Sequence, residues 1–144
     1  MSIKQISVFL ENKPGKLQQM TSVLAANNVD MRALSLAETK DFGIARLVVD
    51  DVFSAVNILK EADFVASLTS VLAVAVPDEP GGLDKLLHIF SEAEVNIEYM
   101  YAFIGGKDTN HAYMIFRVAD TKAAESKLAG KGLKILTQED IAQI

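Results

Sequence analysis

The chain contains no cysteine, so disulfides and thiolate metal sites are excluded. Of its two histidines, His88 lies in a predicted helix and points outward, and His111 opens a predicted strand. Neither has a second histidine or a cysteine at metal-ligand spacing, which favours solvated or structural roles. No nucleophile-elbow pattern accompanies a serine or threonine. The sequence therefore gives no indication of catalysis, of a metal or of another cofactor, and predicts a protein that is not an enzyme.

Long charged runs and long apolar runs are also missing. A formal net charge of −5 without a basic patch gives nucleic acid or an anionic membrane little long-range attraction. The start of the chain, MSIKQISVFLENK, has too short an apolar stretch for a signal peptide. The most apolar segment, residues 64–76, is shorter than the ~20 residues of a spanning helix. We therefore expect a cytoplasmic protein.

The sequence instead contains a duplication. The phrases NKPGKL and DEPGGL place Pro14 and Pro80 66 positions apart, and the same shift aligns VDM (29–31) with VNI (95–97). Farther along the shift becomes 69, because Asp51 matches Asp120. The three extra residues fall in GGKDTN (105–110), where a longer hairpin loop would absorb them. Two halves are thus predicted, 1–68 and 69–144.

Each half follows the same order of elements. An alternating strand (6–10) leads through the Pro-Gly turn into an amphipathic helix from Leu17 onward. Two strands follow, MRALSLAE and IARLVVD in the first half and IEYMYAF and AYMIFRVAD in the second. Asp51 and Asp120 are among the N-cap candidates for a second helix, and a short strand near 64–68 or 133–136 ends each unit. The order βαββαβ, written twice, predicts an α+β protein.

This order predicts two ferredoxin-like units, each an antiparallel sheet with both helices on one face. No linker separates the halves, so we expect the sheets to join into one eight-stranded sheet. The opposite face is also apolar, which predicts a homodimer with sheets packed face to face. The residues on that face are Phe9, Ile44, Val48, Ala73, Ala75, Tyr113 and Ile115.

The same strand order serves RNA-binding domains, which need aromatic residues on the central strands and a basic surface. Phe9 and Tyr113 supply exposed aromatics, but the negative charge and the missing basic-aromatic motif argue against RNA binding.

The Pro-Gly turns, each followed by an amphipathic helix and then by VDM or VNI, resemble the ACT domain, a module that binds amino acids and regulates enzymes of amino-acid metabolism. The resemblance covers the whole chain as two tandem repeats, like stand-alone bacterial tandem ACT proteins. It implies a ligand at the seam between repeats, which lie side by side through their second strands. One repeat contributes its strand-turn-helix loop and the other the start of its second strand.

Carried onto this sequence, the resemblance implies two seam sites. The residues of the first are Asn12, Lys13, Pro14, Gly15, Lys16 and Leu17 from one half, with Asn96, Ile97, Glu98, Tyr99 and Met100 from the other. The residues of the second are Asp78, Glu79, Pro80, Gly81, Gly82 and Leu83, with Asp30, Met31 and Arg32.

The two predicted sites differ in charge. Asparagine can donate to an amino acid's carboxylate and accept from its ammonium group, whereas two aspartates repel the carboxylate and each other. We therefore expect the Asn12/Asn96 site to bind better. Arg32 and Glu98 stand at matching positions and could form a salt bridge across the seam. The predicted function is amino-acid sensing that is read by a partner enzyme or regulator. The alternative is a constitutive interaction or regulatory subunit without a ligand.

Overall fold

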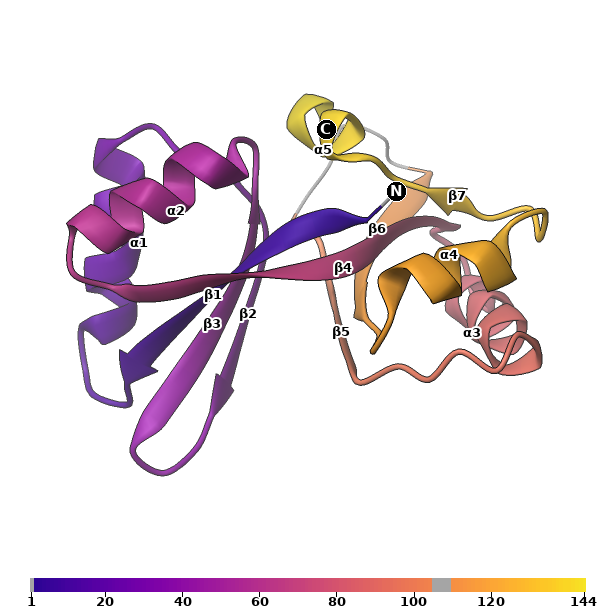
Figure 1. The fold of residues 1–144 in the computed structure, drawn as a ribbon, viewed down its shortest axis with the longest axis horizontal. Coiled ribbons are helices and arrows are strands. Elements are labelled where there is room, and N and C mark those ends of the chain that lie inside the picture. Colours follow the sequence, from indigo (N-terminus) through magenta and orange to yellow (C-terminus); the bar gives the residue numbers. More distant parts are fainter. Residues whose placement is uncertain (1, 105–109) are drawn as a thin grey trace.

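The computed structural model describes residues 2–104 and 110–144 (Figure 1). Its elements are, in chain order, β1 (Ile3–Glu11), α1 (Lys16–Ala26), β2 (Met31–Glu38), β3 (Phe42–Val49), α2 (Val52–Glu61), β4 (Val65–Pro77), α3 (Gly82–Glu92), β5 (Tyr99–Ala102), β6 (His111–Arg117), α4 (Thr121–Leu128), β7 (Lys134–Ile135) and α5 (Gln138–Gln143). Apart from Asn110, the hairpin loop predicted at 105–110 lies outside the described residues. Within these described ranges, no helix is both long and apolar enough to cross a membrane.

The described residues form one antiparallel sheet of seven strands, not the predicted eight. The difference comes from β4, which is the last strand of the first half and the first strand of the second. Its residues 65–71 pair with β1, and its residues 72–77 pair with β6. Residues 64–76 contain neither glycine nor proline, so nothing breaks the extended chain between the halves.

Both halves use the same strand order. The order is β2-β3-β1-β4 in the first half and β5-β6-β4-β7 in the second. The second strands of the halves also meet, because Ala33 and Phe103 form an antiparallel bridge and the Ile104 amide donates to the Arg32 carbonyl oxygen over 2.8 Å. The predicted division between Leu68 and Thr69 falls inside β4 and stays a prediction.

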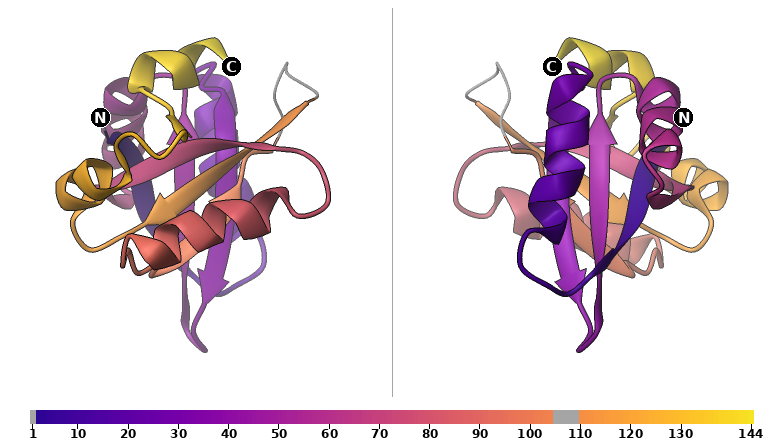
Figure 2. Two further views of the ribbon diagram at one scale, coloured as in Figure 1. Left: turned by 90° about the vertical axis from the view of Figure 1, so that its right-hand side faces the viewer. Right: turned by 90° about the vertical axis from the view of Figure 1, so that its left-hand side faces the viewer.

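Helices α1 and α2 cover one end of the sheet, and α3 and α4 cover the other (Figures 1 and 2). Each pair encloses its own hydrophobic core. The first core contains Ile6, Met20 and Leu47, and the second contains Phe90 and Phe116, whose ring centroids lie 4.9 Å apart. The predicted caps are confirmed, since Asp51 accepts from the Ser54 amide and Asp120 from the Ala123 amide.

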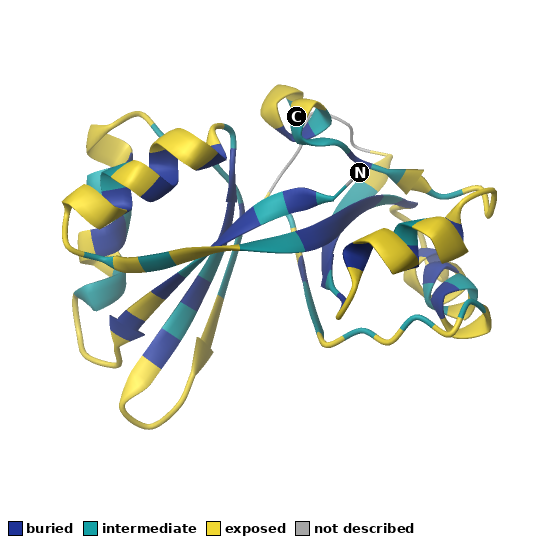
Figure 3. Ribbon diagram, viewed as in Figure 1, coloured by how far each residue is buried: buried dark blue, intermediate teal, exposed yellow. Residues whose placement is uncertain are grey.

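A third core lies between the two halves, where their helix-free faces turn toward each other (Figure 3). Val48 of the first half and Ala73 and Ile115 of the second are fully buried there. The expectation that these residues form an open partner surface is therefore wrong. Phe9, in contrast, is 50% exposed.

The C-terminal helix α5 completes this third core. Its residue Ile141 is fully buried among the helix-free faces. Only α1 to α4 therefore lie on the predicted face of the sheet, and α5 covers the other. Helix α5 begins with a capping box, in which Thr137 accepts from the Asp140 amide and the Asp140 carboxylate accepts from the Thr137 amide.

Candidate functional site

The two Pro-Gly turns have nearly identical backbone conformations. Gly15 and Gly81, the N-cap residues of α1 and α3, are left-handed, with φ of 85° and 84°. This conformation favours glycine because it has no Cβ to meet the carbonyl oxygen. At both Gly15 and Gly81 a Cβ would also have no heavy atom within 4 Å among the described neighbours. The backbone of both turns is therefore open at its glycine.

The helices that follow these turns lack the side-chain caps of the other helices. Asp51, Asp120 and Thr137 cap α2, α4 and α5, but in the described structure no side chain caps α1 or α3. Helix N-termini carry unpaired amide groups and a partial positive charge. At α1 the Lys16 amide reaches the Lys13 carbonyl oxygen, and the next two amides remain available. An anionic group would satisfy them.

A cavity of about 260 Å³ lies beside the first turn. The first predicted site supplies Asn12, Lys13, Lys16 and Leu17 to its wall, and β2 supplies Leu36 and Glu38. Drug-sized ligands occupy sites of roughly 300–1,000 Å³, so this cavity suits a smaller molecule. The remaining lining residues are Leu10, Glu11 and Gly43.

The amide nitrogen of Asn12 already has partners within the chain. Its Nδ2 group donates toward the β2–β3 hairpin, to Glu38 Oε2 (3.2 Å) and to the carbonyl oxygens of Thr39 (3.3 Å) and Lys40 (3.4 Å). The amide oxygen is left to accept from a ligand, and an acceptor suits an ammonium group.

Exposed charges surround the cavity. Lys13 Nζ lies 2.8 Å from Glu11 Oε2, and Lys16 Nζ lies 4.0 Å from Glu11 Oε1. The hydrogen bond with Lys13 lowers the pKa of Glu11 and raises the pKa of Lys13. Both groups are therefore charged at neutral pH, and the site presents cations and an anion side by side.

Asn96, the other predicted asparagine, lines a separate cavity of about 220 Å³ with Val95, Asp120 and Lys127. The chain therefore does not bring Asn12 and Asn96 together in one cavity. The second strands meet at Ala33 and Phe103, beyond the other end of β5 from Asn96.

The residues after Asn96 have structural partners. Ile97 and Met100 pack into the second core. Glu98 lies 3.8 Å from Arg117, and Arg32 pairs with Asp30, so the predicted salt bridge between Arg32 and Glu98 is absent from the described structure.

More groups of the second predicted site than of the first are engaged within the chain, although its turn is exposed and as open at Gly81 as the first turn is at Gly15. Asp30 is paired with Arg32, which also donates to the carbonyl oxygens of Ile141 (3.1 Å) and Ala142 (2.9 Å) in α5. Gly82 is buried against the carbonyl oxygen of Pro77. Met31 packs into the first core. At the turn itself, the Asp78 and Glu79 amides donate to Asn110 and Pro77, Pro80 and Gly81 continue the turn, and Leu83 is 38% exposed.

The histidines lie as predicted. His88 is exposed, and His111 begins β6. A hydrogen bond to the Asp84 carbonyl oxygen raises the pKa of His88, and the Asp84 carboxylate adds to the effect. In the portions of the chain that the structure describes, no group of three acidic, histidine or cysteine residues could hold a metal.

Two features were missed from the sequence. Helix α5 has a short signal in T137-Q-E-D140, which is a capping-box pattern followed by the apolar Ile141. The other is a polar cluster around Gln5, which is fully buried between the halves. Its only sequence signal is a long polar side chain in an alternating strand.

Comparison with known proteins agrees with this architecture. Protein BT0572 from Bacteroides thetaiotaomicron is 37% identical and has a TM-score of 0.91, with 100% of this chain and 98% of that chain covered. The regulatory subunit of aspartate kinase from Thermus thermophilus shares the fold, with 16% identity, a TM-score of 0.64 and coverage of 87% and 89%. No curated protein matches the chain. Residues 1–144 match the family described as an ACT domain pair, and the chain therefore belongs to that family.

Proposed function

We propose that this ACT domain pair is a non-enzymatic regulatory protein that binds a free amino acid in the cavity beside Asn12. The observation that carries the proposal is the convergence of three features there. The turn at Gly15 is open, the N-terminus of α1 has no side-chain cap, and the cavity is lined by Asn12 and two lysines. The first two features recur at Gly81 and α3, so the cavity is what favours the first turn.

These features suggest an orientation for the ligand. Its carboxylate would accept from the free amides in the first turn of α1, near Lys16, where the helix dipole favours an anion. Its ammonium group would donate to Asn12 Oδ1 or to Glu38, which both line the cavity. The side chain would then lie toward Leu36.

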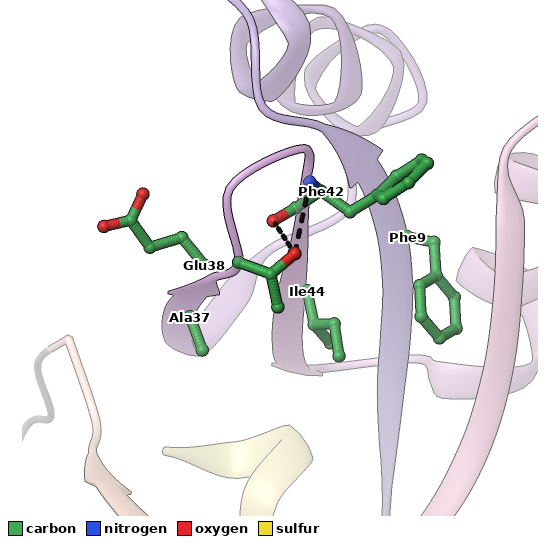
Figure 4. A pocket seen from close by; sticks show the side chains of 6 residues that line it. Phe9, Ala37, Glu38, Phe42 and Ile44 are labelled. Carbon is green, nitrogen blue, oxygen red and sulfur yellow. Dashed lines mark hydrogen bonds between the residues drawn. The ribbon is translucent and has the colours of Figure 1, made fainter.

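Asn12 and Asn96 line different cavities within one copy of the chain. The other predicted residues of this site, Asn96 to Met100, would therefore come from a second copy. We propose a homodimer for this reason and for a second one. Three apolar side chains at the free end of the first half are at least half exposed: Phe9 (50%), Phe42 (56%) and Val65 (67%). Phe9 and Phe42 border an open apolar groove of about 540 Å³ together with Ile44 and Ala37 (Figure 4).

The equivalent surface of the second half is covered by α5 and by the first half. The groove on the first half has no such cover within one chain, and a second copy would provide it. Ligand binding would stabilise one arrangement of the halves or one oligomer, in proportion to its differential affinity. A partner enzyme or regulator of amino-acid metabolism would read that change.

The Asp78/Asp30 site remains the weaker one in this proposal. Asp30 already has Arg32 as a partner, and Gly82 is packed against the backbone of Pro77. A ligand would have to displace these contacts.

A constitutive interaction module without a ligand is the second candidate, and the exposed apolar groove favours it. A thermal-shift screen against the twenty amino acids at millimolar concentration separates the two. A ligand at a hundred times its Kd stabilises the folded protein by about 2.7 kcal/mol.

Two substitutions locate the site. Asn12→Ala removes the acceptor. Asn12→Asp keeps an acceptor but replaces the donor Nδ2 by an oxygen that repels Glu38 and the carbonyl oxygens of Thr39 and Lys40. Both should weaken the stabilisation, and Asn96→Ala should reduce it if a second copy completes the site. A screen without any stabilising amino acid, or a shift that survives Asn12→Ala and Asn96→Ala, would favour the interaction module.

A further inference from the structure

A row of polar side chains crosses the helix-free face of the first half. Ser35 on β2 pairs with Arg46 on β3, Arg46 pairs with Ser7 on β1, and Ser7 pairs with Ser67 on β4. Directly paired residues share a face of the sheet. The row on one side is apolar, with Ile44 and Phe9. The row on the other side has Ala33 and Val48 on β2 and β3 but Gln5 and Thr69 on β1 and β4, so the polar area extends to Gln5.

Arg46 is the cation of this row, and it lies beneath the opposite half. Its guanidinium carbon is 3.8 Å from the centroid of the Tyr99 ring on β5, a cation–π contact. Among the described residues, this cation–π contact is the interaction of the guanidinium, and no hydrogen bond or ion pair joins it to them. A guanidinium carries five donors in a planar fork that matches a carboxylate. Arg46 is half-buried and none of its guanidinium nitrogens is sealed from solvent without a partner, so these donors are open to an acceptor that approaches from solvent.

Gln5 positions two hydroxyl groups near Arg46, those of Tyr99 and Ser7. Its Nε2 group donates to the hydroxyl oxygens of Tyr99 (2.8 Å) and Ser7 (3.2 Å), and its Oε1 accepts from Tyr101 (2.6 Å). Because both hydroxyls accept from Gln5, their own hydrogens are available to donate elsewhere. Gln5 is fully buried, so its position is fixed by packing.

From this arrangement we propose that Arg46, the Tyr99 hydroxyl and the Ser7 hydroxyl bind the carboxylate of a small molecule between the two halves. The body of that molecule would lie over Ile44 and Phe9, which border the open apolar groove. This ligand is a carboxylate with a short apolar group, either a carboxylic acid or an amino acid. Arg46, Tyr99, Ser7, Ile44 and Phe9 do not line the cavity beside Asn12, although Glu38 borders both that cavity and the groove.

The protein has an intrinsic reporter for this site. It contains three tyrosines and no tryptophan, and all three tyrosines, Tyr99, Tyr101 and Tyr113, lie in the core between the halves. Tyrosine fluorescence therefore comes entirely from that core. A carboxylate that engages Arg46 and the Tyr99 hydroxyl should change it.

The probes form a matched set: 4-methylpentanoate, its neutral amide, and leucine, which adds an α-ammonium group to the same skeleton. Each is titrated by tyrosine fluorescence and calorimetry, with a light-scattering mass at each end point. The mass separates binding from a change of oligomer at the neighbouring groove. We expect 4-methylpentanoate to bind at least about tenfold more tightly than its amide, because only the carboxylate pairs with Arg46.

The variants test the residues. Arg46→Met keeps the apolar stem and should weaken 4-methylpentanoate at least about tenfold, and Tyr99→Phe keeps the ring and should weaken it a few fold. Arg46→Lys should restore only part of the affinity, because a lysine lacks the fork. Lys85→Met on exposed α3 is the control and should leave 4-methylpentanoate binding unchanged. A loss of 4-methylpentanoate binding in Asn12→Ala with full binding in Arg46→Met would assign it to the proposed amino-acid site and overturn this one.

Leucine tests whether the ligand is an amino acid or a carboxylic acid without an ammonium group. If leucine binds with the same dependence on Arg46, amino acids are included, and if it is rejected, the ligand lacks the ammonium group. Equal affinity for the amide, full affinity in Arg46→Met and Tyr99→Phe, or no binding of either carboxylate up to about 10 mM, would overturn the proposal.

Discussion

Gly82 lies directly against the carbonyl oxygen of Pro77, so that a methyl group at position 82 would overlap it. The equivalent position in the first half is Lys16, whose side chain borders the cavity beside Asn12. The first residue of the helix is therefore packed against the preceding strand in one copy and borders a cavity in the other, while the glycine before it, Gly15 or Gly81, is open in both. This difference adds to the exchange of asparagine for aspartate between the two predicted sites.

Gly82→Ala should destabilise the protein by about 1–3 kcal/mol, because the turn must move away from β4 to make room. Lys16→Ala at the equivalent position should change the free energy of unfolding by no more than about 0.5 kcal/mol. Urea unfolding followed by circular dichroism measures both. If the two substitutions have equal effects, the contact between Gly82 and Pro77 is not a constraint.

Arg32→Met should loosen α5. Arg32 donates two hydrogen bonds to carbonyl oxygens at the C-terminal end of this helix, and hydrogen bonds with a charged partner contribute roughly 1.5–3 kcal/mol. Amide hydrogen exchange should accelerate in Gln138–Gln143 while β1 and β4 stay protected. Arg117→Met, which removes a hydrogen bond to the Ser70 carbonyl oxygen, is the matched control and should leave exchange in α5 unchanged. If α5 in Arg32→Met is as well protected from exchange as in the wild type, the hydrogen bonds of Arg32 do not hold this helix in place.

Tyr101 should make the protein sensitive to alkali. Burial raises the pKa of Tyr101 far above its ordinary value of 10.0, with a smaller contribution from the charge of Tyr99. The folded state therefore keeps its proton where the unfolded state releases it. This contribution to stability is complete below about pH 10 and falls as the pH rises further.

Unfolding curves recorded from pH 8 to pH 11, together with tyrosinate absorbance, measure this effect. We expect stability to decrease above about pH 10 and one tyrosine to ionise only as the chain unfolds. Tyr101→Phe should show a shallower decrease. If all three tyrosines ionise reversibly in the folded protein, burial does not protect Tyr101.

The exposed groove predicts the oligomeric state. Phe9→Ser and Phe42→Ser, alone and together, should convert the proposed homodimer into a monomer, because both rings border the groove. Phe53→Ser is the control, since Phe53 is 61% exposed on α2, away from the groove. Light scattering at micromolar protein distinguishes the masses. A wild-type monomer at that concentration, or a dimer that Phe53→Ser alone disrupts, would reject this interface.

The sequence predicts most local elements because their signals are local. The segment MRALSLAE coincides with β2, and Asp51 and Asp120 cap the helices that they precede. The same holds for the first half of the site. Asn12, Lys13, Lys16 and Leu17 share a cavity because one strand-turn-helix segment carries them all.

The sequence does not predict contacts between the halves. Alternation identifies the two faces of a strand, but it does not say which faces meet, and Ala73 and Ile115 are buried by the other half and by α5. For the same reason the pairing of Asn12 with Asn96 depends on the placement of whole halves. Likewise, the sequence does not indicate that Gln5 is buried, because its hydrogen-bond partners Tyr99 and Tyr101 belong to the other half.

The shared strand β4 has a consequence for cutting and rejoining the chain. A break between Leu68 and Thr69 would leave each fragment with only part of a strand that is hydrogen-bonded to β1 across that point, at Ile6↔Leu68 and Gln5↔Thr69. The N-terminal fragment would retain β1 with bare donors and acceptors, and these match the severed end of the C-terminal fragment. Coexpressed fragments would thus associate by strand complementation. In a split reporter built at this point, the pairing between β1 and β4 would fix the register of the two fragments.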